Sequence, residues 1–315
     1  MVKVGTRASK LALLQTELVK ERFQQHNKKT PVEVVQINTG GDKNRSVPIS
    51  RIGGTGVFVK ELEEALLNKS VDFVVHSLKD MPTESPEGLR IAAVLNRMDP
   101  RDVLLSRNKI TLKELKPGSK IATSSRRRLA QLKSLRKDLE FIDMRGNVPT
   151  RVKKMEDGFC DAIILAAAGL IRLGMEEHIT EYLGEEQCTA AAGQGALAIQ
   201  CRADDQDLIA ALAKLDEPMV NKEITAERAF LKVLGGGCSV PIGARAVYQE
   251  DYGNLTLSAC VASLDGTRVV RLKLSSDDDS PEHLGVRLAE MMLKTEARDI
   301  LKELKESEPN LISPP

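Results

Sequence analysis

Short apolar runs rich in β-branched residues alternate along the chain with segments whose apolar positions recur every three or four residues. This alternation predicts strands and helices in succession, a pattern typical of parallel α/β units. The predicted strands are Val2–Val4, Val32–Ile37, Asp72–His76, Ile91–Leu95, Lys120–Thr123, Glu140–Met144 and Ala162–Leu165. Helices are expected over Leu11–Leu18, Phe58–Leu66, Ser125–Arg136 and a segment that continues to Lys153.

The pattern changes near residue 255. Leu255–Val261 and Arg268–Leu274 alternate between apolar and polar positions, as antiparallel strands with one buried face do. One long charged helix is expected to follow, from about Pro281 to Glu306. A run of antiparallel strands followed by a helix favours a separate, small α+β domain.

Polar residues gather where the predicted strands end. In open parallel sheets, ligands bind outside the carboxyl ends of the strands. These ends carry the sequences TRAS (6–9), TGGD (39–42), SLKD (77–80), TSSRRR (123–128) and RGN (145–147). They come from both halves of the α/β region, so the sequence predicts an anion-binding cleft between two α/β domains.

Composition narrows the functional classes. The 315 residues are 42% hydrophobic and 29% charged, which is typical of a soluble globular protein, and the net charge is only +1. We therefore expect neither a nucleic-acid nor a membrane partner, and an anion site must come from local clustering of arginines. The longest apolar stretch, residues 162–171, is too short to span a bilayer, and the chain opens without the apolar core of a signal peptide.

The five cysteines include no CxxC pair, which argues against a zinc knuckle or a redox-active disulfide, and we expect no metal. Free thiols in odd number fit a reducing compartment, so a cytoplasmic location is expected. Cys238 stands apart in the sequence GGGCSVP, because three glycines leave room beside a thiol that must carry a bulky group. The remaining cysteines lie in or beside apolar segments and are expected in the core: Cys160, Cys188, Cys201 and Cys260. The glycines of GGTGVF (53–58) fit no phosphate-loop or dinucleotide motif, which excludes a nucleotide site.

The arginine motifs each allow two interpretations. In TSSRRR, hydroxyls and free backbone N–H groups at a helix start form an anion site, whereas the alternative is a solvated basic face. Arg145 and Arg151 flank a predicted helix start and suit carboxylate recognition, because a guanidinium binds carboxylates with two parallel hydrogen bonds. The alternative there is a helix-capping loop with a surface ion pair.

Asp80 follows an apolar strand in the sequence HSLKDMP. It could serve as a general acid or base, or as the counter-ion of a developing cation, with Lys79 keeping it ionised. The alternative is a plain turn before Pro82. His76 closes the strand and is expected to be a hydrogen-bonded structural residue.

Taken together, these segments resemble the porphobilinogen deaminase family over essentially the whole chain. The matching stretches, in order, are GTRASKLALLQ, GGDK, GTGVFVKELEEALL, DFVVHSLKDMP, ATSSRRRLAQL, DMRGNVPTRV, LAAAGLIRLG, AAGQGALAIQCR and FLKVLGGGCSVPIGA. The resemblance implies two α/β domains similar to periplasmic binding proteins and a small α+β domain that bears the cofactor cysteine. The implied boundaries are residues 1–95 with 196–214 for the first domain, 99–194 for the second and 218–315 for the third.

The resemblance also implies an activity. Four porphobilinogen molecules are condensed with loss of ammonia on a dipyrromethane primer attached to Cys238, and hydrolysis releases hydroxymethylbilane. Asp80 is implied as the catalytic carboxylate, which stabilises the azafulvene-like cation left when ammonia departs. The implied cofactor-binding residues are Asp42, Ser77, Lys79, Thr123, Ser124, Ser125, Arg127, Arg128, Arg145 and Gly146. The implied substrate-binding residues are Arg7, Ser9, Arg151, Arg172 and Gln194.

Three positions qualify the resemblance. Arg51 and Thr55 stand where some family members have lysines, and Arg126 stands where an apolar residue is common, so Arg126 is not assigned to the site. We expect a monomer. The competing class is a non-enzymatic anion-binding module of the periplasmic-binding-protein type, which would explain the arginine-lined cleft but not GGGCSVP or the additional domain.

Overall fold

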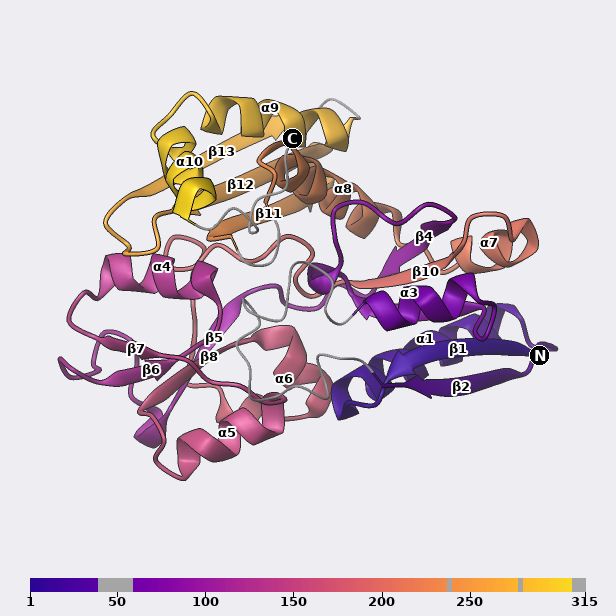
Figure 1. Cartoon of the computed structure of the whole chain (residues 1–315), viewed down its shortest axis with the longest axis horizontal. Helices are drawn as coiled ribbons and strands as arrows, with labels where there is room; N and C mark the ends of the chain where they lie inside the picture. The colour runs from indigo at the N-terminus through magenta and orange to yellow at the C-terminus, as the bar shows by residue number, and fades with distance from the viewer. Residues whose placement is uncertain (39–58, 237–239, 277–279, 308–315) are drawn as a thin grey trace. The chain divides into compact units, whose positions relative to one another are not determined.

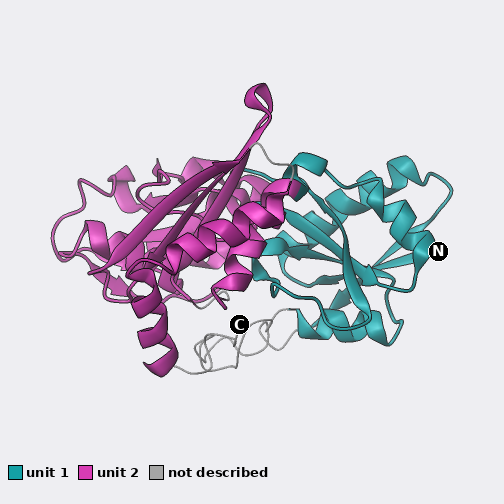
Figure 2. Cartoon of the chain, turned by 90° about the horizontal axis from the view of Figure 1, so that it is seen from above, with its two compact units in different colours: residues 1–98, 195–221 teal, residues 99–194, 222–315 magenta. Residues whose placement is uncertain are grey.

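A computed structural model describes residues 1–38, 59–236, 240–276 and 280–307. Asp42, Arg51, Thr55 and Cys238 lie outside these ranges, and so do the glycine-rich segment 53–58 and residues 237–239 of the loop that contains Cys238. The chain divides into two compact units, coloured separately in Figure 2. Unit 1 comprises residues 1–98 and 195–221, and unit 2 comprises residues 99–194 and 222–315.

Unit 1 is built on one five-stranded sheet with the strand order β2-β1-β3-β10-β4. β1 (Val2–Arg7), β2 (Val32–Ile37) and β3 (Phe73–Ser77) run parallel to one another. β10 (Leu197–Arg202) is inserted between β3 and β4 (Leu89–Leu95) and runs antiparallel to both. A segment more than a hundred residues further along the chain therefore completes the sheet.

Helices cover this sheet because their apolar positions repeat with the period of a helix turn. α1 (Lys10–His26) buries Thr16, Val19 and Phe23, and the Phe23 ring lies 5.7 Å from the ring of Phe73 in β3. The other helices of the unit are α3 (Lys60–Leu67), the 3-10 turn η2 (Leu78–Asp80) and α7 (Gln206–Ala213).

Unit 2 contains a second five-stranded sheet with the order β7-β6-β8-β5-β9. β6 (Lys120–Ala122) runs parallel to β7 (Glu140–Ile142) and β8 (Ala162–Ala166). β5 (Asp102–Ser106) is antiparallel to β8 and also pairs with β9 (Glu181–Tyr182). The helices around it are α4 (Arg126–Leu135), α5 (Val148–Glu156) and α6 (Ala167–Leu173), with 3-10 turns η3 (Arg107–Lys109) and η4 (Glu176–His178).

The remainder of unit 2 is an antiparallel sheet of β11 (Ile242–Gln249), β12 (Asn254–Ala262) and β13 (Val269–Ser276). Its helices pack on it around a hydrophobic core of their own, as the orange and yellow part of Figure 1 shows. They are α8 (Pro218–Val233), which begins in unit 1 and continues into unit 2, α9 (Pro281–Met292) and α10 (Ala297–Ser307). A 3-10 turn, η5 (Glu250–Tyr252), joins β11 to β12.

The expected fold class is confirmed: two α/β sheets are accompanied by a small antiparallel sheet with helices. The expected parallel pairing is present in both sheets, but β10 and β5 run antiparallel to their neighbours, which was not predicted. Strands of either direction that are buried on both faces have the same apolar composition, so the sequence pattern could not distinguish them. Among the described residues, no helix is both long and apolar enough to cross a membrane.

The single helix expected from Pro281 to Glu306 is also wrong, because the chain breaks between α9 and α10. The hydroxyl of Thr295 donates to the Met292 carbonyl at 2.6 Å and accepts from the Ala297 N–H at 3.2 Å. A threonine that bonds the backbone on both sides ends one helix and caps the next. Met292 and Ala297 are fully buried, so the break allows both helices to pack on the same sheet.

Candidate active site

The edge of the unit 1 sheet formed by the carboxyl ends of β1 and β3 brings several predicted site residues together. Parallel neighbours end at the same edge, so Arg7 at the end of β1 and Ser77 at the end of β3 share it. Ser9 caps α1, its hydroxyl accepting from the Ala12 N–H at 3.3 Å. Lys79 and Asp80 follow immediately after Ser77 in the turn η2.

Asp80 is held by its neighbours rather than by contacts of its own side chain. Leu78 and Met81, on either side, are buried, and the Met81 N–H donates to the Leu78 carbonyl at 3.0 Å. The half-buried carboxylate of Asp80 makes no hydrogen bond within the described part of the chain. Asp80 thus lies in a turn, and the turn leaves its carboxylate available to a ligand.

His76 is the structural residue that the sequence predicted. Its Nε2 lies 3.0 Å from the Gln200 amide oxygen, and the Gln200 amide nitrogen donates to Glu63 at 2.9 Å. Burial lowers the pKa of His76 to about 4, although the Gln200 hydrogen bond opposes the shift, and the charge of Arg7 lowers it as well. His76 is therefore neutral at pH 7.

The hydroxyls that follow β6 in unit 2 shape the start of α4. Ser125 is the N-cap and accepts from the Arg128 N–H at 3.4 Å, while the Thr123 hydroxyl accepts from the Ser125 N–H at 3.2 Å. Ser124 donates to the Met144 carbonyl at 2.6 Å, which joins this turn to the end of the next strand. The three hydroxyls thus fix the turn whose backbone was predicted to bind an anion.

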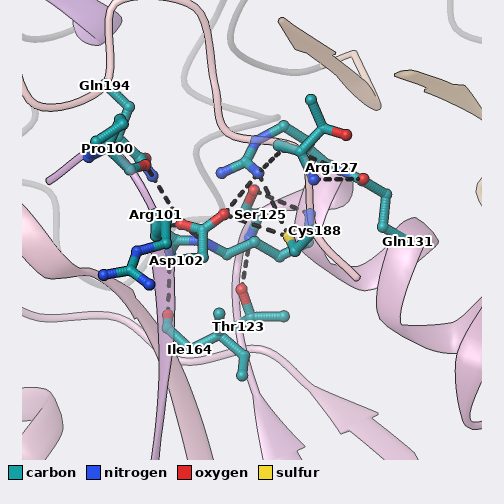
Figure 3. A network of polar contacts seen from close by, with 12 residues as sticks. Pro100, Arg101, Asp102, Thr123, Ser125, Arg127, Gln131, Ile164, Cys188 and Gln194 are labelled. Carbon is teal, nitrogen blue, oxygen red and sulfur yellow. Dashed lines mark hydrogen bonds and ion pairs between the residues drawn. The ribbon is translucent and has the colours of Figure 1, made fainter. Parts of the chain in front are cut away.

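Arg127 and Arg128 do not form a solvated basic face, so that alternative is wrong. They are 5% and 7% exposed, and both donate to the fully buried carboxylate of Asp102 in β5 (Figure 3). Arg127 Nη1 donates to Asp102 Oδ2 at 2.6 Å, and Arg128 donates to Oδ1 through Nε at 2.9 Å and Nη2 at 2.8 Å. Burial alone would raise the pKa of Asp102, but the two adjacent positive charges hold it well below its usual range.

Gln194, another predicted site residue, converges on the same carboxylate. Its amide nitrogen donates to Asp102 Oδ1 at 2.9 Å and to the Pro100 carbonyl at 2.6 Å. Asp102 was not predicted from the sequence as a site residue. The available signal was an acidic residue at the start of an otherwise apolar strand, DVLLS, since such a carboxylate needs a buried cation beside it.

Arg145, Gly146 and Arg151 lie in the loop and first turn of α5. Asn147 caps this helix by accepting from the Thr150 N–H at 3.0 Å. Gly146 has φ +132°, and a Cβ there would meet Thr150 at 3.0 Å, so only glycine fits. Its carbonyl accepts from Arg151 Nε at 2.7 Å.

Three positive charges, those of Arg128, Arg145 and Arg151, act on one another around the start of α5. Burial and the charges of Arg128 and Arg145 lower the pKa of Arg151 to about 10, against an opposing effect of Asp143. Burial lowers the pKa of Arg172, in the last turn of α6, to about 10 as well. The Nε and Nη2 atoms of Arg145 are buried and find no hydrogen-bond partner among the described residues. Buried donors without partners cost about 1–3 kcal/mol each, so this arrangement fits a carboxylate ligand.

The match to a known protein family agrees with a site that binds a carboxylate ligand. Residues 2–210 match the family model described as "Porphobilinogen deaminase, dipyromethane cofactor binding domain", and residues 221–294 match "Porphobilinogen deaminase, C-terminal domain". The chain belongs to the porphobilinogen deaminase family. The chain catalyses the condensation of porphobilinogen in tetrapyrrole biosynthesis, and its cofactor is dipyrromethane.

Family members from several bacteria match over nearly the whole length. The porphobilinogen deaminase of Brevibacillus brevis is 46% identical and is covered to 98%, with 97% of this chain included. The Bacillus subtilis deaminase is 44% identical, with 96% of each chain covered. Among solved structures, a methionine-bound nutrient binding protein from Burkholderia cenocepacia has a TM-score of 0.45 at 16% identity, covering 68% of this chain and 91% of that protein.

The cofactor-binding domain model includes every predicted site residue of both sheets that the structure describes. The C-terminal domain model includes Cys238, which lies outside the described residues. Both domain models belong to one enzyme family, so membership in this family excludes the non-enzymatic binding module as the main function.

Proposed function

We propose that this chain performs the deaminase reaction with Asp80 as its catalytic carboxylate, Cys238 as its cofactor attachment site and the arginines of unit 2 as carboxylate ligands. The observation that carries the proposal is the guanidinium of Arg145, whose buried Nε and Nη2 lack a partner within the described residues. A guanidinium in this state, among other positive charges, is suited to an anionic ligand.

The arginines explain how a highly charged ligand is bound. Porphobilinogen carries two carboxylates, and a dipyrromethane built from it carries four. Arg145, Arg151 and Arg172 are proposed to hold such groups. Two buried nitrogens of Arg145 have no partner among the described residues, and burial lowers the pKa of Arg151 and Arg172. At the edge of the unit 1 sheet, Arg7 and the Ser9 hydroxyl are also proposed to bind substrate carboxylates.

Asp80 is proposed to act by charge and by hydrogen bonding. When bound, the dipyrromethane supplies a free pyrrole α-carbon as the nucleophile of the condensation. Loss of ammonia from porphobilinogen leaves a delocalised cation, and a fixed carboxylate stabilises that charge as it develops. The Asp80 oxygens can also accept a hydrogen bond from a pyrrole N–H and so orient the ring. The rigid turn between Leu78 and Met81 keeps this carboxylate in place.

Cys238 is proposed as the attachment site partly because the other thiols are unsuited to it. Cys160, Cys188, Cys201 and Cys260 are all buried. Burial raises the pKa of Cys160, Cys201 and Cys260 to about 11 and raises that of Cys188 further. A thiol must ionise to attack carbon, and a buried thiol has no room for two pyrrole rings.

Intact mass spectrometry of the purified protein tests this proposal. We expect the wild-type chain to carry the added mass of one dipyrromethane, the Cys238→Ser chain to carry none, and a Cys160→Ser control to be loaded like wild type. An acid aldehyde reagent for pyrroles should colour the loaded chains only. An unmodified wild-type chain would refute the proposed cofactor chemistry, and a loaded Cys238→Ser chain would refute the attachment site.

We further propose that the enzyme acts as a monomer in the cytoplasm. The odd number of cysteines without CxxC pairing supports a reducing compartment. Light scattering at micromolar concentration measures the molar mass directly, and a value near 34.5 kDa is expected. Twice that mass would contradict the monomer.

A further inference from the structure

Three residues assigned to ligand binding by the family resemblance share one internal partner. Arg127, Arg128 and Gln194 come from α4 and from the segment before β10, yet all three donate to the carboxylate of Asp102 (Figure 3). The Cys188 thiol donates to Asp102 Oδ2 as well, at 3.3 Å. Asp102 itself is 0% exposed.

This carboxylate has little capacity left for anything else. Oδ1 accepts from Arg128 Nε, Arg128 Nη2 and Gln194, and Oδ2 accepts from Arg127 and Cys188. A carboxylate offers about four acceptor sites, so both oxygens are saturated. Its negative charge would moreover repel a carboxylate ligand. Asp102 is therefore placed to act on the ligand only through the side chains that it holds.

The contacts fix orientation as well as position. Arg128 meets Asp102 through two nitrogens of one guanidinium, which sets the plane of that group, and its third nitrogen donates to the Ile164 carbonyl at 3.0 Å. Arg127 Nη1 bonds both Asp102 and the Thr189 carbonyl, each at 2.6 Å. Two guanidinium groups face one carboxylate, so the cluster of Arg127, Arg128 and Asp102 retains one net positive charge and still attracts an anion.

We propose that Asp102 is a positioning residue of the reaction, which holds Arg127 and Arg128 in the orientation that binds the carboxylates of cofactor and substrate. This inference rests on the proposed function. Preorganised donors do not have to reorient when a charged ligand binds, so an enzyme with fixed arginines binds and reacts faster than one with mobile arginines. The competing view is that Asp102 is only a buried counter-ion that maintains the fold.

The variant that separates these views is Asp102→Asn. It keeps the shape of the side chain, removes its charge and places the new amide N–H groups against the N–H donors that now face the carboxylate. Its matched control is Asp161→Asn. Asp161 accepts from Arg107 at 2.7 Å and from the Lys120 N–H at 2.8 Å, so it is also an arginine-paired aspartate of the same sheet. It lies before β8, at the opposite edge from the hydroxyls that follow β6.

The readouts are taken on folded, monodisperse protein: the fraction of chains that carry the dipyrromethane mass, and the rate of a single porphobilinogen addition per loaded chain. For Asp102→Asn we expect loading or the rate, or both, to fall at least about tenfold. The apparent KM for porphobilinogen should rise, and Asp161→Asn should remain within about twofold of wild type. A structural counter-ion would lower the thermal midpoint and leave both quantities unchanged per folded chain.

Asp102→Glu is the second test variant if Asp102→Asn does not fold, because glutamate keeps the negative charge and displaces it by one methylene. A fall of more than about fivefold in loading or rate, with the chain folded, supports positioning. Full loading and a wild-type rate in folded Asp102→Asn, or in folded Asp102→Glu where asparagine fails, would overturn it. Failure of the proposed function is distinct, because then the wild-type chain itself would lack the dipyrromethane mass.

Discussion

Replacing Arg145 with leucine should separate ligand binding from fold stability. The Nε and Nη2 atoms of Arg145 are buried without a partner among the described residues, and its charge acts on the like charge of Arg151. The folded protein therefore gains little from this guanidinium in the absence of a ligand. We expect Arg145→Leu to weaken binding of the carboxylate ligands while the cofactor-free protein is as stable as its parent, or more stable.

The magnitude follows from the two available donors. A hydrogen bond to a charged group contributes about 1.5–3 kcal/mol, so two such contacts to one ligand carboxylate set an upper limit of about 3–6 kcal/mol. Leucine also relieves the repulsion between Arg145 and Arg151, which offsets part of that loss. We expect a net loss of about 2–3 kcal/mol, which corresponds to roughly 30- to 150-fold in affinity.

Two assays measure the two sides of this prediction. Affinity is taken from the porphobilinogen dependence of single additions to loaded enzyme, and stability from urea unfolding in a Cys238→Ser background. The control is Arg136→Leu, because the donors of Arg136 are occupied by Asp138 at 2.8 Å and by the carbonyls of Leu112 and Leu115 at 2.6 and 2.7 Å. Arg136→Leu should lower stability and leave porphobilinogen affinity unchanged.

A lysine at position 145 should restore only part of the affinity, because it offers a point charge in place of a planar fork. Parental affinity in Arg145→Leu, or a loss of stability in the cofactor-free chain as large as that of Arg136→Leu, would contradict this prediction. Either result would mean that the guanidinium of Arg145 serves the fold.

Three further variants test the remaining assignments. Asp80→Asn should slow single porphobilinogen additions by at least about a hundredfold with little change in affinity, while Asp80→Glu retains more activity; equal rates in Asn and wild type would leave Asp80 a turn residue. Cys238→Ser should abolish cofactor attachment but keep the fold, seen as an unmodified mass with wild-type circular dichroism. His76 has a pKa of about 4 when folded, against about 6.5 when unfolded, so the unfolded chain binds one more proton between these values. Lowering the pH across that window should therefore cost about 3 kcal/mol of stability, a dependence that urea titrations of His76→Gln should lack.

Several features of the site could be predicted from sequence because they depend on neighbouring residues. Ser9, Ser125 and Asn147 each cap a helix three residues before the N–H that they accept from, so the motif and its contact lie in one short segment. The apolar run ahead of His76 placed that residue in the sheet, where the structure shows it buried. The order of the motifs along the chain was sufficient to indicate the family.

The directions of β5 and β10 depended on tertiary structure, because buried strands of either direction have the same composition. The hydrogen-bond partners of the arginines could not be predicted from the sequence either. Asp102 is 25 residues from Arg127 and 92 from Gln194 in sequence, and no local pattern links positions so far apart. The sequence pattern of an arginine-rich helix start is the same whether its charges face water, a ligand or a buried carboxylate. The sequence by itself determined which residues carry charge at each strand end, whereas packing of the sheet decided which of those charges are compensated internally and which remain available to a ligand.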